Sequence, residues 1–458
     1  MPVAPDPSRV PVVLATSNGV GMGHLTRQLS VALAGADALD VTLLSLSGAL
    51  PTVARAVADG RLPGAEHVRV EHCPSRTSPW QGAGAAKVAW RTAWDPYFAD
   101  RLVALAAETG ARVVAFDGVV PYAGLLAARR RLPGTAFVWV RRGMWRQGVG
   151  APWLARADAF DLVVEPGDLG AAADTGPTAG DTGALRTAPV SLTTHVPALG
   201  RAAARAALGL DPDRPALLLA PGSGAYADVG ELVRRVREHL RTAAPQWQVA
   251  LTRQAIARSG AGGSGGSGTQ DGDVVALRDT YPLARYLAAF DAAVGAAGYN
   301  AVHEHLAVGL PTLLVPSTAH ETDDQVARTR GVVARGAALA STDESDLTGA
   351  LDRLLDPAVR RELTAVCAGL ETPDGATTIA RELVALGRGR APAPWPARVG
   401  PPAWRRALTR PVARRRGTPY LTEAVTDVDP QVPVEHLRAG ASPRYRALRE
   451  RAARWLYA

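Results

Sequence analysis

Two halves of the chain share one pattern, in which short apolar runs alternate with longer segments of helical period. Over residues 1–185 the runs are rich in β-branched residues, which predicts buried parallel strands joined by crossover helices. The expected strands are Val12–Thr16, Asp40–Leu46, Val68–His72, Arg112–Phe116, Ala136–Val140 and Phe160–Glu165. The expected helices are Leu25–Leu33, Leu50–Ala58, Ala85–Ala107 and Tyr122–Arg131.

The same pattern restarts after Pro197. Its expected strands are Ala216–Ala220, Gln248–Thr252, Val274–Leu277, Ala292–Gly295 and Thr312–Val315. Its expected helices are Val229–Arg241, Ala301–Ala307, Gln325–Arg335 and Glu344–Leu355. The predicted fold class is therefore α/β, with two doubly wound, Rossmann-like domains at residues 9–186 and 197–387 and a tail at residues 388–458.

Composition agrees with a folded chain and locates the positive charge. The protein has 458 residues, 47% of them hydrophobic, which excludes a mainly disordered chain. The net charge of +8 comes from the tail, where 15 arginines face five acids, so residues 1–387 carry 36 bases and 38 acids. Lys87 is the one lysine. Charge confined to a tail does not predict a nucleic-acid partner.

Cysteine usage and hydropathy indicate a compartment. Cys73 and Cys367 lie far apart and form no metal or redox spacing, which favours a reducing compartment. No run approaches the roughly 18–20 apolar residues that a membrane span requires. We expect a cytoplasmic protein, and a peripheral location at the inner face of the cell membrane stays open.

Two glycine-rich turns follow strands at equivalent places in the halves. The first, Ser17–His24, contains Gly21 and Gly23, and the second is Ala220–Ala225. Glycine lets the backbone approach a ligand, and the helix that follows presents free N–H groups to an anion. Plain turns without a ligand remain open for both. His24 lies on the first helical turn, at the sheet edge where open α/β sheets bind ligands, although a capping or core histidine is the alternative.

A third segment, Gly295–Pro316, is more specific, because it reads as strand, glycine turn, helix and strand. On the helix, Glu304 is suited to accept both hydroxyls of a ribose. The pair Asp324-Gln325 at the next helix start suits the hydroxyls of a sugar. A solvated helix face for Glu304 and an N-cap for Asp324 are the competing interpretations.

These three motifs, in this order, resemble glycosyltransferase family 28, which includes the peptidoglycan N-acetylglucosaminyltransferase. The resemblance implies the GT-B fold, in which two doubly wound domains face each other across a cleft. It also implies that Glu304 holds the donor ribose and that Asp324 and Gln325 orient the sugar. The residues implied to face the diphosphate are Gly222, Ser223, Gly224, Ala225, Gly298, Asn300 and Ala301. The match is thin between Leu44 and Asp161, where acceptor-binding segments are expected.

An inverting transfer needs a base at the acceptor hydroxyl and positive potential at the departing phosphates. We expect His24 to be the base and Asp117, at a strand end, to orient it, although Asp117 could instead cap its own helix. We expect Gly21, Gly23, Arg141 and Arg142 to face the acceptor or its phosphates, with an ordinary solvated loop as the alternative for the arginines. No metal site and no cofactor are expected, because helix N-termini can neutralise the phosphates.

The predicted function is transfer of a hexosyl group, with N-acetylhexosaminyl included, from a nucleoside-diphosphate sugar, expected to be UDP-linked, to a hydroxyl of a cell-envelope or glycolipid acceptor. Three alternatives stay open: a secondary-metabolite glycosyltransferase, a nucleotide-sugar 2-epimerase, and a non-catalytic sugar-nucleotide-binding subunit.

Two segments fall outside these motifs. The tail at residues 388–458 mixes arginine clusters with Trp and Tyr, which is typical of contact with an anionic membrane, and its last helical segment, Ser442–Tyr457, could equally lie against the first domain. The glycine-rich run Ser259–Thr269 predicts a flexible surface loop, to which we assign no function.

Overall fold

The structure is a computed structural model, and it describes residues 8–17, 22–76, 85–222, 229–252, 274–277, 279–343 and 345–390, without the side chains of residues 85–92. The chain forms two compact units. Of the described residues, those within 8–72, 111–121 and 134–390 form one unit, which contains both sheets, and those within 73–110 and 122–133 form the other. Residues 391–458 of the expected tail and the loop 259–269 lie outside the described residues.

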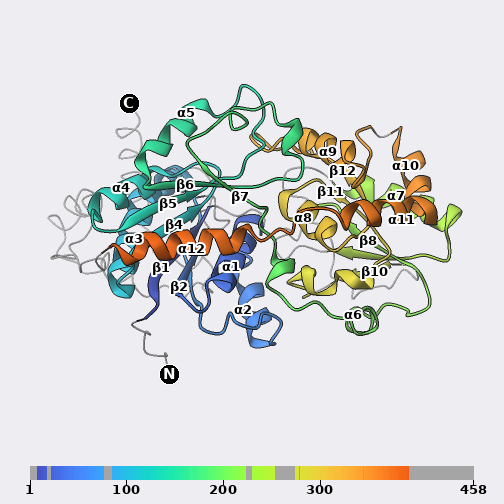
Figure 1. The fold of residues 1–458 in the computed structure, drawn as a ribbon, viewed down its shortest axis with the longest axis horizontal. Coiled ribbons are helices and arrows are strands. Elements are labelled where there is room, and N and C mark those ends of the chain that lie inside the picture. The colour runs from blue at the N-terminus through green and yellow to red at the C-terminus, as the bar shows by residue number, and fades with distance from the viewer. Residues whose placement is uncertain are drawn as a thin grey trace, which may run out of the picture. The chain divides into compact units, whose positions relative to one another are not determined.

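The first half of the chain forms a parallel sheet with the order β3-β2-β1-β4-β5-β6-β7 (Figure 1). Its strands are β1 (Val10–Thr16), β2 (Leu39–Ser45), β3 (Arg69–His72), β4 (Val113–Asp117), β5 (Ala136–Val140), β6 (Leu162–Pro166) and β7 (Leu185–Thr187). The chain builds outward from β1 in one direction and then from β4 in the other. The order therefore reverses between β1 and β4, which is the topological switch point.

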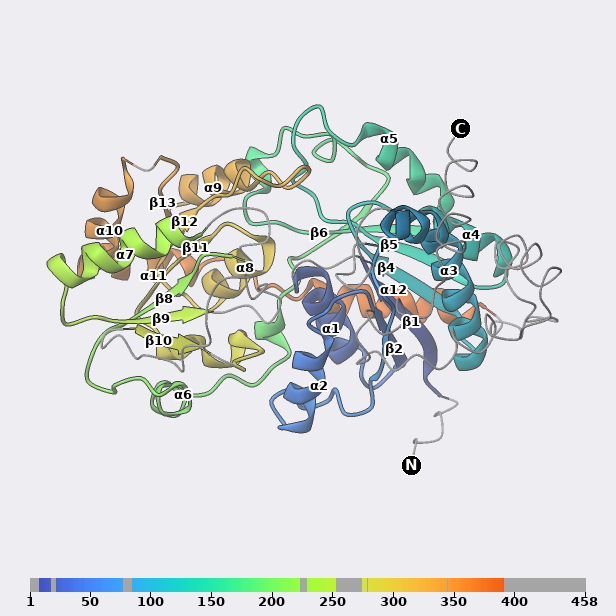
Figure 2. The same ribbon diagram turned by 180° about the vertical axis from the view of Figure 1, so that it is seen from behind.

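The second half repeats this topology in a sheet with the order β10-β9-β8-β11-β12-β13 (Figure 2). Its strands are β8 (Ala216–Ala220), β9 (Gln248–Thr252), β10 (Val274–Leu277), β11 (Ala292–Ala296), β12 (Thr312–Val315) and β13 (Leu339–Ala340). The switch point lies between β8 and β11. The predicted α/β class with two doubly wound sheets is confirmed.

The α-helices of the described residues include several that the sequence pattern missed, namely α6, α11 and α12. They are α1 (Gly23–Ala34), α2 (Leu50–Ala58), α3 (Ala85–Thr109), α4 (Ala123–Arg131), α5 (Ala151–Leu154), α6 (Arg201–Leu208), α7 (Gly230–Ala243), α8 (Tyr299–Ala307), α9 (Gln325–Ala334), α10 (Leu347–Leu355), α11 (Pro357–Cys367) and α12 (Gly375–Arg388). None of these helices is both long and apolar enough to cross a bilayer.

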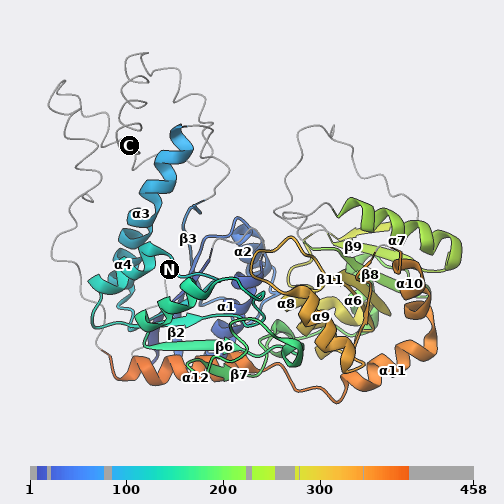
Figure 3. The same ribbon diagram turned by 90° about the horizontal axis from the view of Figure 1, so that it is seen from above.

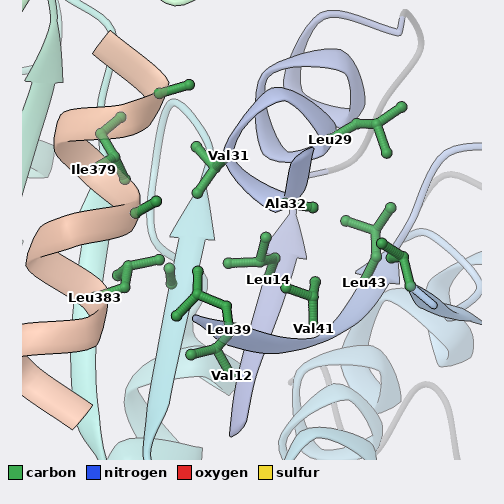
Figure 4. Close-up of a cluster of buried hydrophobic side chains, with 14 of the residues drawn as sticks. Val12, Leu14, Leu29, Val31, Ala32, Leu39, Val41, Leu43, Ile379 and Leu383 are labelled. Carbon is green, nitrogen blue, oxygen red and sulfur yellow. The ribbon is translucent and has the colours of Figure 1, made fainter. Parts of the chain in front are cut away.

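Helix α12 contributes to the core of the first sheet, although it follows the second sheet in the chain. Ile379 and Leu383 are fully buried in the same cluster as Val12, Leu14 and residues of α1 and β2 (Figure 4). Each such apolar side chain stabilises the fold by about 1.5–3 kcal/mol. The chain thus returns to its first sheet, while the expected domain limits at residues 186, 197 and 387 stay a prediction.

The other compact unit contains α3 and α4, which lie side by side (Figure 3). The ring of Trp94 stacks on Phe98, with 5.0 Å between centroids, and meets Tyr122 edge-on at 4.8 Å. The Asp95 carboxylate accepts the Gly124 N–H at 2.8 Å and so ties α3 to the start of α4.

Candidate active site

The carboxyl ends of β1 and β4 bring together His24 and Asp117. His24 is the second residue of α1, which follows β1, and Asp117 is the last residue of β4, paired in register with Thr16. His24 Nδ1 lies 2.6 Å from Asp117 Oδ1. Both residues therefore meet at the switch point of the first sheet, where open α/β sheets bind ligands.

Arg27 completes this cluster, and the sequence analysis did not identify it. Its Nε donates to Asp117 Oδ2 at 2.9 Å and its Nη2 donates to Oδ1 at 2.6 Å. The Arg27 side chain is only 4% exposed. Arg27 follows His24 by three residues on α1, so the spacing that places it on the same helix face was a usable signal.

The contacts with Asp117 assign the tautomer of His24. Nδ1 lies 2.6 Å from Asp117 Oδ1, which can only accept, and 2.8 Å from Arg27 Nη2, which can only donate. We assign the proton to Nδ1 because the contact with the carboxylate is the shorter of the two, and Nε2 then keeps its lone pair. Within the described part of the chain, Nε2 has no hydrogen-bond partner. The imidazole thus offers one acceptor, held in a fixed orientation.

Burial and neighbouring charge set the protonation of the pair. Burial lowers the pKa of His24; Asp117 opposes this effect, and the positive charges of Arg27 and Arg142 add to it. Burial alone would raise the pKa of Asp117, but Arg27 and then His24 hold that pKa below its ordinary value. At neutral pH the pair is a neutral imidazole on an ionised carboxylate, which is the state a general base requires.

The turn before α8 occupies the equivalent place on the second sheet. Gly298 caps the helix with φ of −68°, and a Cβ added there would meet no described atom within 4 Å. The described fold therefore does not require glycine at this position, and a ligand could approach the backbone closely there. Asn300 Nδ2 donates to the Gly23 carbonyl at 3.3 Å, and its buried Oδ1 has no partner among the described residues. The start of α8 therefore contacts the start of α1.

Glu304 and Gly222 also lie at this second switch point. Glu304 is half-buried on α8, and no described residue donates a hydrogen bond to it. Burial raises the pKa of its carboxyl to about 7. Gly222, after β8, has φ of 99°, a left-handed conformation that favours glycine. Ala301 lies in the first turn of α8.

Asp324 and Gln325 begin α9, and both side chains already have protein partners. Asp324 caps the helix by accepting the Ala327 N–H at 2.9 Å. The Gln325 amide oxygen accepts the Ser317 N–H at 3.0 Å, and its nitrogen donates to Asp323 at 3.1 Å. The structure therefore shows Asp324 as the N-cap of α9.

Arg141 and Arg142 follow β5 and take different positions. Arg141 is fully buried, and its Nη2 donates to Glu165 at 2.8 Å and to Asp181 at 2.7 Å. Arg142 donates to the Thr322 hydroxyl at 2.9 Å and lies 3.3 Å from Asp323. Arg142 therefore joins the loop after β5 to the loop before α9. A backbone hydrogen bond from Arg146 N–H to the Thr322 carbonyl, at 2.9 Å, joins the same two loops.

A buried ionic chain extends from this loop, and the sequence analysis missed it. Arg328 on α9 donates to Asp168 at 2.7 Å and to Asp323 at 3.0 Å. Burial would raise the pKa of Asp323, but Arg142 and Arg328 together hold it well below the ordinary range. These side chains fix the start of α9 from two directions.

The structure thus gathers His24, Asp117, Gly23 and Asn300, with Arg142 acting on His24 electrostatically. It places Arg141 in a separate group of ion pairs. Four expected site residues lie outside the described part of the chain: Gly21, Ser223, Gly224 and Ala225. Among the described residues, no group of three or more His, Cys, Asp or Glu is placed to hold a metal ion.

Two doubly wound parallel sheets in one chain are the arrangement of the GT-B fold. The solved spinosyn forosaminyltransferase SpnP is similar, with a TM-score of 0.53 and 15% identity over 81% of this chain and 99% of that one. Acinetobacter baumannii MurG is similar with a TM-score of 0.50 and 15% identity over 82% of this chain and 99% of that one. Identities this low show the fold alone.

A curated relative is similar in sequence as well. The UDP-N-acetylglucosamine--N-acetylmuramyl-(pentapeptide) pyrophosphoryl-undecaprenol N-acetylglucosamine transferase of Clavibacter michiganensis is 34% identical over 185 residues, which is 39% of this chain and 48% of the relative. The chain therefore spans about half the length of the curated relatives it matches. No family model matches the sequence.

Proposed function

We propose that this protein is a GT-B glycosyltransferase that moves an N-acetylhexosaminyl or other hexosyl group from a UDP-linked donor to a hydroxyl of a lipid-linked or cell-envelope acceptor. One observation carries the proposal. Asn300, in the first turn of the helix α8 that carries Glu304, bonds to the backbone of Gly23, which directly precedes His24. A candidate donor turn and a candidate base are thereby adjacent in one site. The similarity to transferases that act on UDP-N-acetylglucosamine supports this donor class.

In this proposal the second switch point binds the donor. Glu304 has no partner among the described residues and accepts the two ribose hydroxyls, which match a bidentate carboxylate. The diphosphate lies against backbone N–H groups of two turns, which include Gly222, Ser223, Gly224 and Ala225 in one and Gly298, Asn300 and Ala301 in the other. Asp324 and Gln325 orient the sugar, through the donor or acceptor capacity that their bonds to Ala327, Ser317 and Asp323 leave free.

The first switch point performs the chemistry. The acceptor hydroxyl gives its proton to Nε2 of His24 as its oxygen attacks the anomeric carbon, and the bond to the nucleoside diphosphate breaks with inversion. Asp117 stabilises the imidazolium that forms. The leaving diphosphate is stabilised by the positive end of α8, so the step requires neither a metal nor a cofactor.

The acceptor is approached from the first sheet. We place Gly21, Gly23, Arg141 and Arg142 near the acceptor or its phosphates, with Arg142 the better placed of the two arginines because Arg141 is buried between two carboxylates. A lipid-linked acceptor would bring the protein to the inner face of the cell membrane. The tail at residues 388–458 supplies the arginines that an anionic surface attracts.

A donor panel tests the proposal. The full chain is incubated with UDP-, dTDP- and GDP-linked sugars, and release of the nucleoside diphosphate is followed with and without a polyprenyl-diphosphate-linked sugar. We expect turnover with UDP-N-acetylglucosamine that the acceptor accelerates. Absence of binding and turnover with every donor would refute the enzymatic proposal, and acceleration by an apolar aglycone instead would indicate the secondary-metabolite alternative.

The membrane contact has its own test. Flotation with liposomes that contain anionic lipid compares the full chain with a chain that stops at Gly387. We expect the full chain to float with the liposomes and the shortened chain not to float. Equal flotation of the two proteins would remove the membrane role of the tail.

A further inference from the structure

Arg27 contacts both sides of the proposed active site. On the first sheet it donates two hydrogen bonds to Asp117, the partner of His24. Its guanidinium carbon also lies 5.1 Å from the ring centroid of Tyr299, the first residue of α8. Cations at this distance from an aromatic ring are attracted to it, by about 2 kcal/mol or more where both are buried.

Tyr299 is a fixed partner for this cation. Its ring is buried, its hydroxyl donates to the Gly167 carbonyl at 2.8 Å, and the same oxygen accepts the Val190 N–H at 3.0 Å. The guanidinium of Arg328, which holds the start of α9, lies 5.9 Å from the same ring centroid. The tyrosine thus joins the candidate base cluster to the helix that carries Glu304.

We propose that Arg27 is a positioning residue that holds the Asp117 carboxylate against Nδ1 of His24 and couples the orientation of the base to the position of the donor helix α8. The inference rests on the proposed function. It deepens that function, because a displaced α8 removes the ring from Arg27 and loosens the cluster that orients Nε2. The base is then competent only when the donor helix is in place.

Charge explains why an arginine is needed at this position. A buried carboxylate next to an imidazole favours the imidazolium, which cannot accept a proton. Burial is the largest cause that lowers the pKa of His24, Asp117 opposes it, and the charge of Arg27 adds to the lowering and so offsets part of the attraction of Asp117. The other groups that act on the cluster are Arg142, which also lowers the pKa of His24, Asp323 before α9, and Tyr299 and His303 on α8.

Geometry adds a second reason. The planar guanidinium reaches both carboxylate oxygens of Asp117 at once and presents its face to the ring, which a lysine ammonium cannot do. Arg27→Lys should therefore preserve the charge and lose the orientation. Arg27→Gln should lose both.

The test combines a titration with kinetics on the full chain. The imidazole of His24 is titrated by NMR, and the pH profile of kcat/KM for UDP-N-acetylglucosamine is measured, for the parent, Arg27→Gln and Arg27→Lys. Arg234→Gln is the matched control, because Arg234 forms ion pairs with Glu231 and Glu238 at the exposed surface of α7.

For Arg27→Gln we expect the titration of His24 and the acidic limb of the profile to move upward by about one pH unit, which lowers kcat/KM about tenfold on that limb. For Arg27→Lys we expect an unmoved titration, a kcat lowered about tenfold and an unchanged KM. The control should match the parent in both measurements.

Two results would overturn the inference: an unmoved His24 titration in Arg27→Gln, or a parental kcat in Arg27→Lys. The second variant decides the question if the first fails to fold. The NMR titration needs no turnover, so a parent that is inactive with every donor would refute the proposed function while leaving the charge coupling of Arg27 measurable.

Discussion

The two switch points differ in how far their charged and polar side chains are paired with other protein groups. At the first sheet, Asp117 is 1% exposed and each of its oxygens accepts a hydrogen bond from Arg27. At the second sheet, Glu304 and the Asn300 carbonyl oxygen have no partner among the described residues. A paired cluster holds a reactive group in one orientation, whereas polar groups without a protein partner keep their hydrogen-bonding capacity for a ligand. The contrast supports the proposal that the first switch point carries the base and the second binds the donor.

The sharpest way to break this contrast is to remove the base. For His24→Ala we expect kcat to fall about 10²–10⁴-fold with an unchanged KM for the donor, because general-base catalysis contributes about this much. Asp117→Asn should also lower kcat, since the amide no longer fixes the tautomer of His24. His239→Ala is a matched control, because that histidine pairs with Asp352 away from the site. Parental kcat in His24→Ala would show that the base lies elsewhere.

The buried ionic chain should matter for stability. Arg328→Met leaves Asp168 buried without its arginine and leaves Asp323 with Arg142 alone, and breaking a buried ion pair costs about 3–5 kcal/mol. Arg234→Met, at an exposed pair, should change the free energy of unfolding by less than about 1 kcal/mol. Urea unfolding followed by circular dichroism measures both. Equal midpoints for the two variants would contradict the structural role of Arg328.

The binding side of the contrast depends on Glu304. Glu304→Ala removes the acceptor for two hydroxyls, and we expect the KM for UDP-N-acetylglucosamine to rise about 10²-fold with a smaller change in kcat. Glu231→Ala removes an exposed carboxylate of α7 and serves as the control. An unchanged KM in steady-state kinetics would remove the ribose contact from the proposal.

The smallest expected effect is a pH dependence of stability. The native state keeps a proton on Glu304 up to its pKa of about 7, whereas the unfolded chain loses it near 4.5. The native state binds more protons in this window, so stability falls as pH rises through it. Glu304→Gln cannot ionise and should gain on the order of 2 kcal/mol over the parent between pH 4.5 and pH 8. Thermal unfolding at both pH values measures this gain, and a constant difference would contradict the raised pKa.

Local patterns were sufficient to predict β1–β6 and β8–β12, but they missed the short edge strands β7 and β13. The apolar strand β1 and the helix that starts next to His24 are read from neighbouring residues, and their pairing follows from general topology. Helix α12 has a local helical period at Ile379 and Leu383, but its packing against strands more than 300 residues earlier could not be predicted from that pattern. Nothing within a local window reports such a partner.

The same reason explains which site residues could be predicted. His24 and Glu304 stand in glycine-rich contexts that are readable from the sequence. The partner of Arg27 lies 90 residues away and that of Arg328 lies 160 residues away, so their roles emerge only when the chain is folded. Asp324 was ambiguous from the start, because a capping aspartate and a sugar-binding one look alike in sequence.

One measurement tests the division of labour between the two turns most directly. Calorimetric titration of UDP-N-acetylglucosamine into the parent, His24→Ala and Glu304→Ala compares donor affinity without any need for turnover. We predict that His24→Ala binds within about twofold of the parent and that Glu304→Ala binds about 10²-fold more weakly. Equal affinity of Glu304→Ala and the parent, or equal losses in both variants, would contradict the assignment of binding to the second sheet and chemistry to the first.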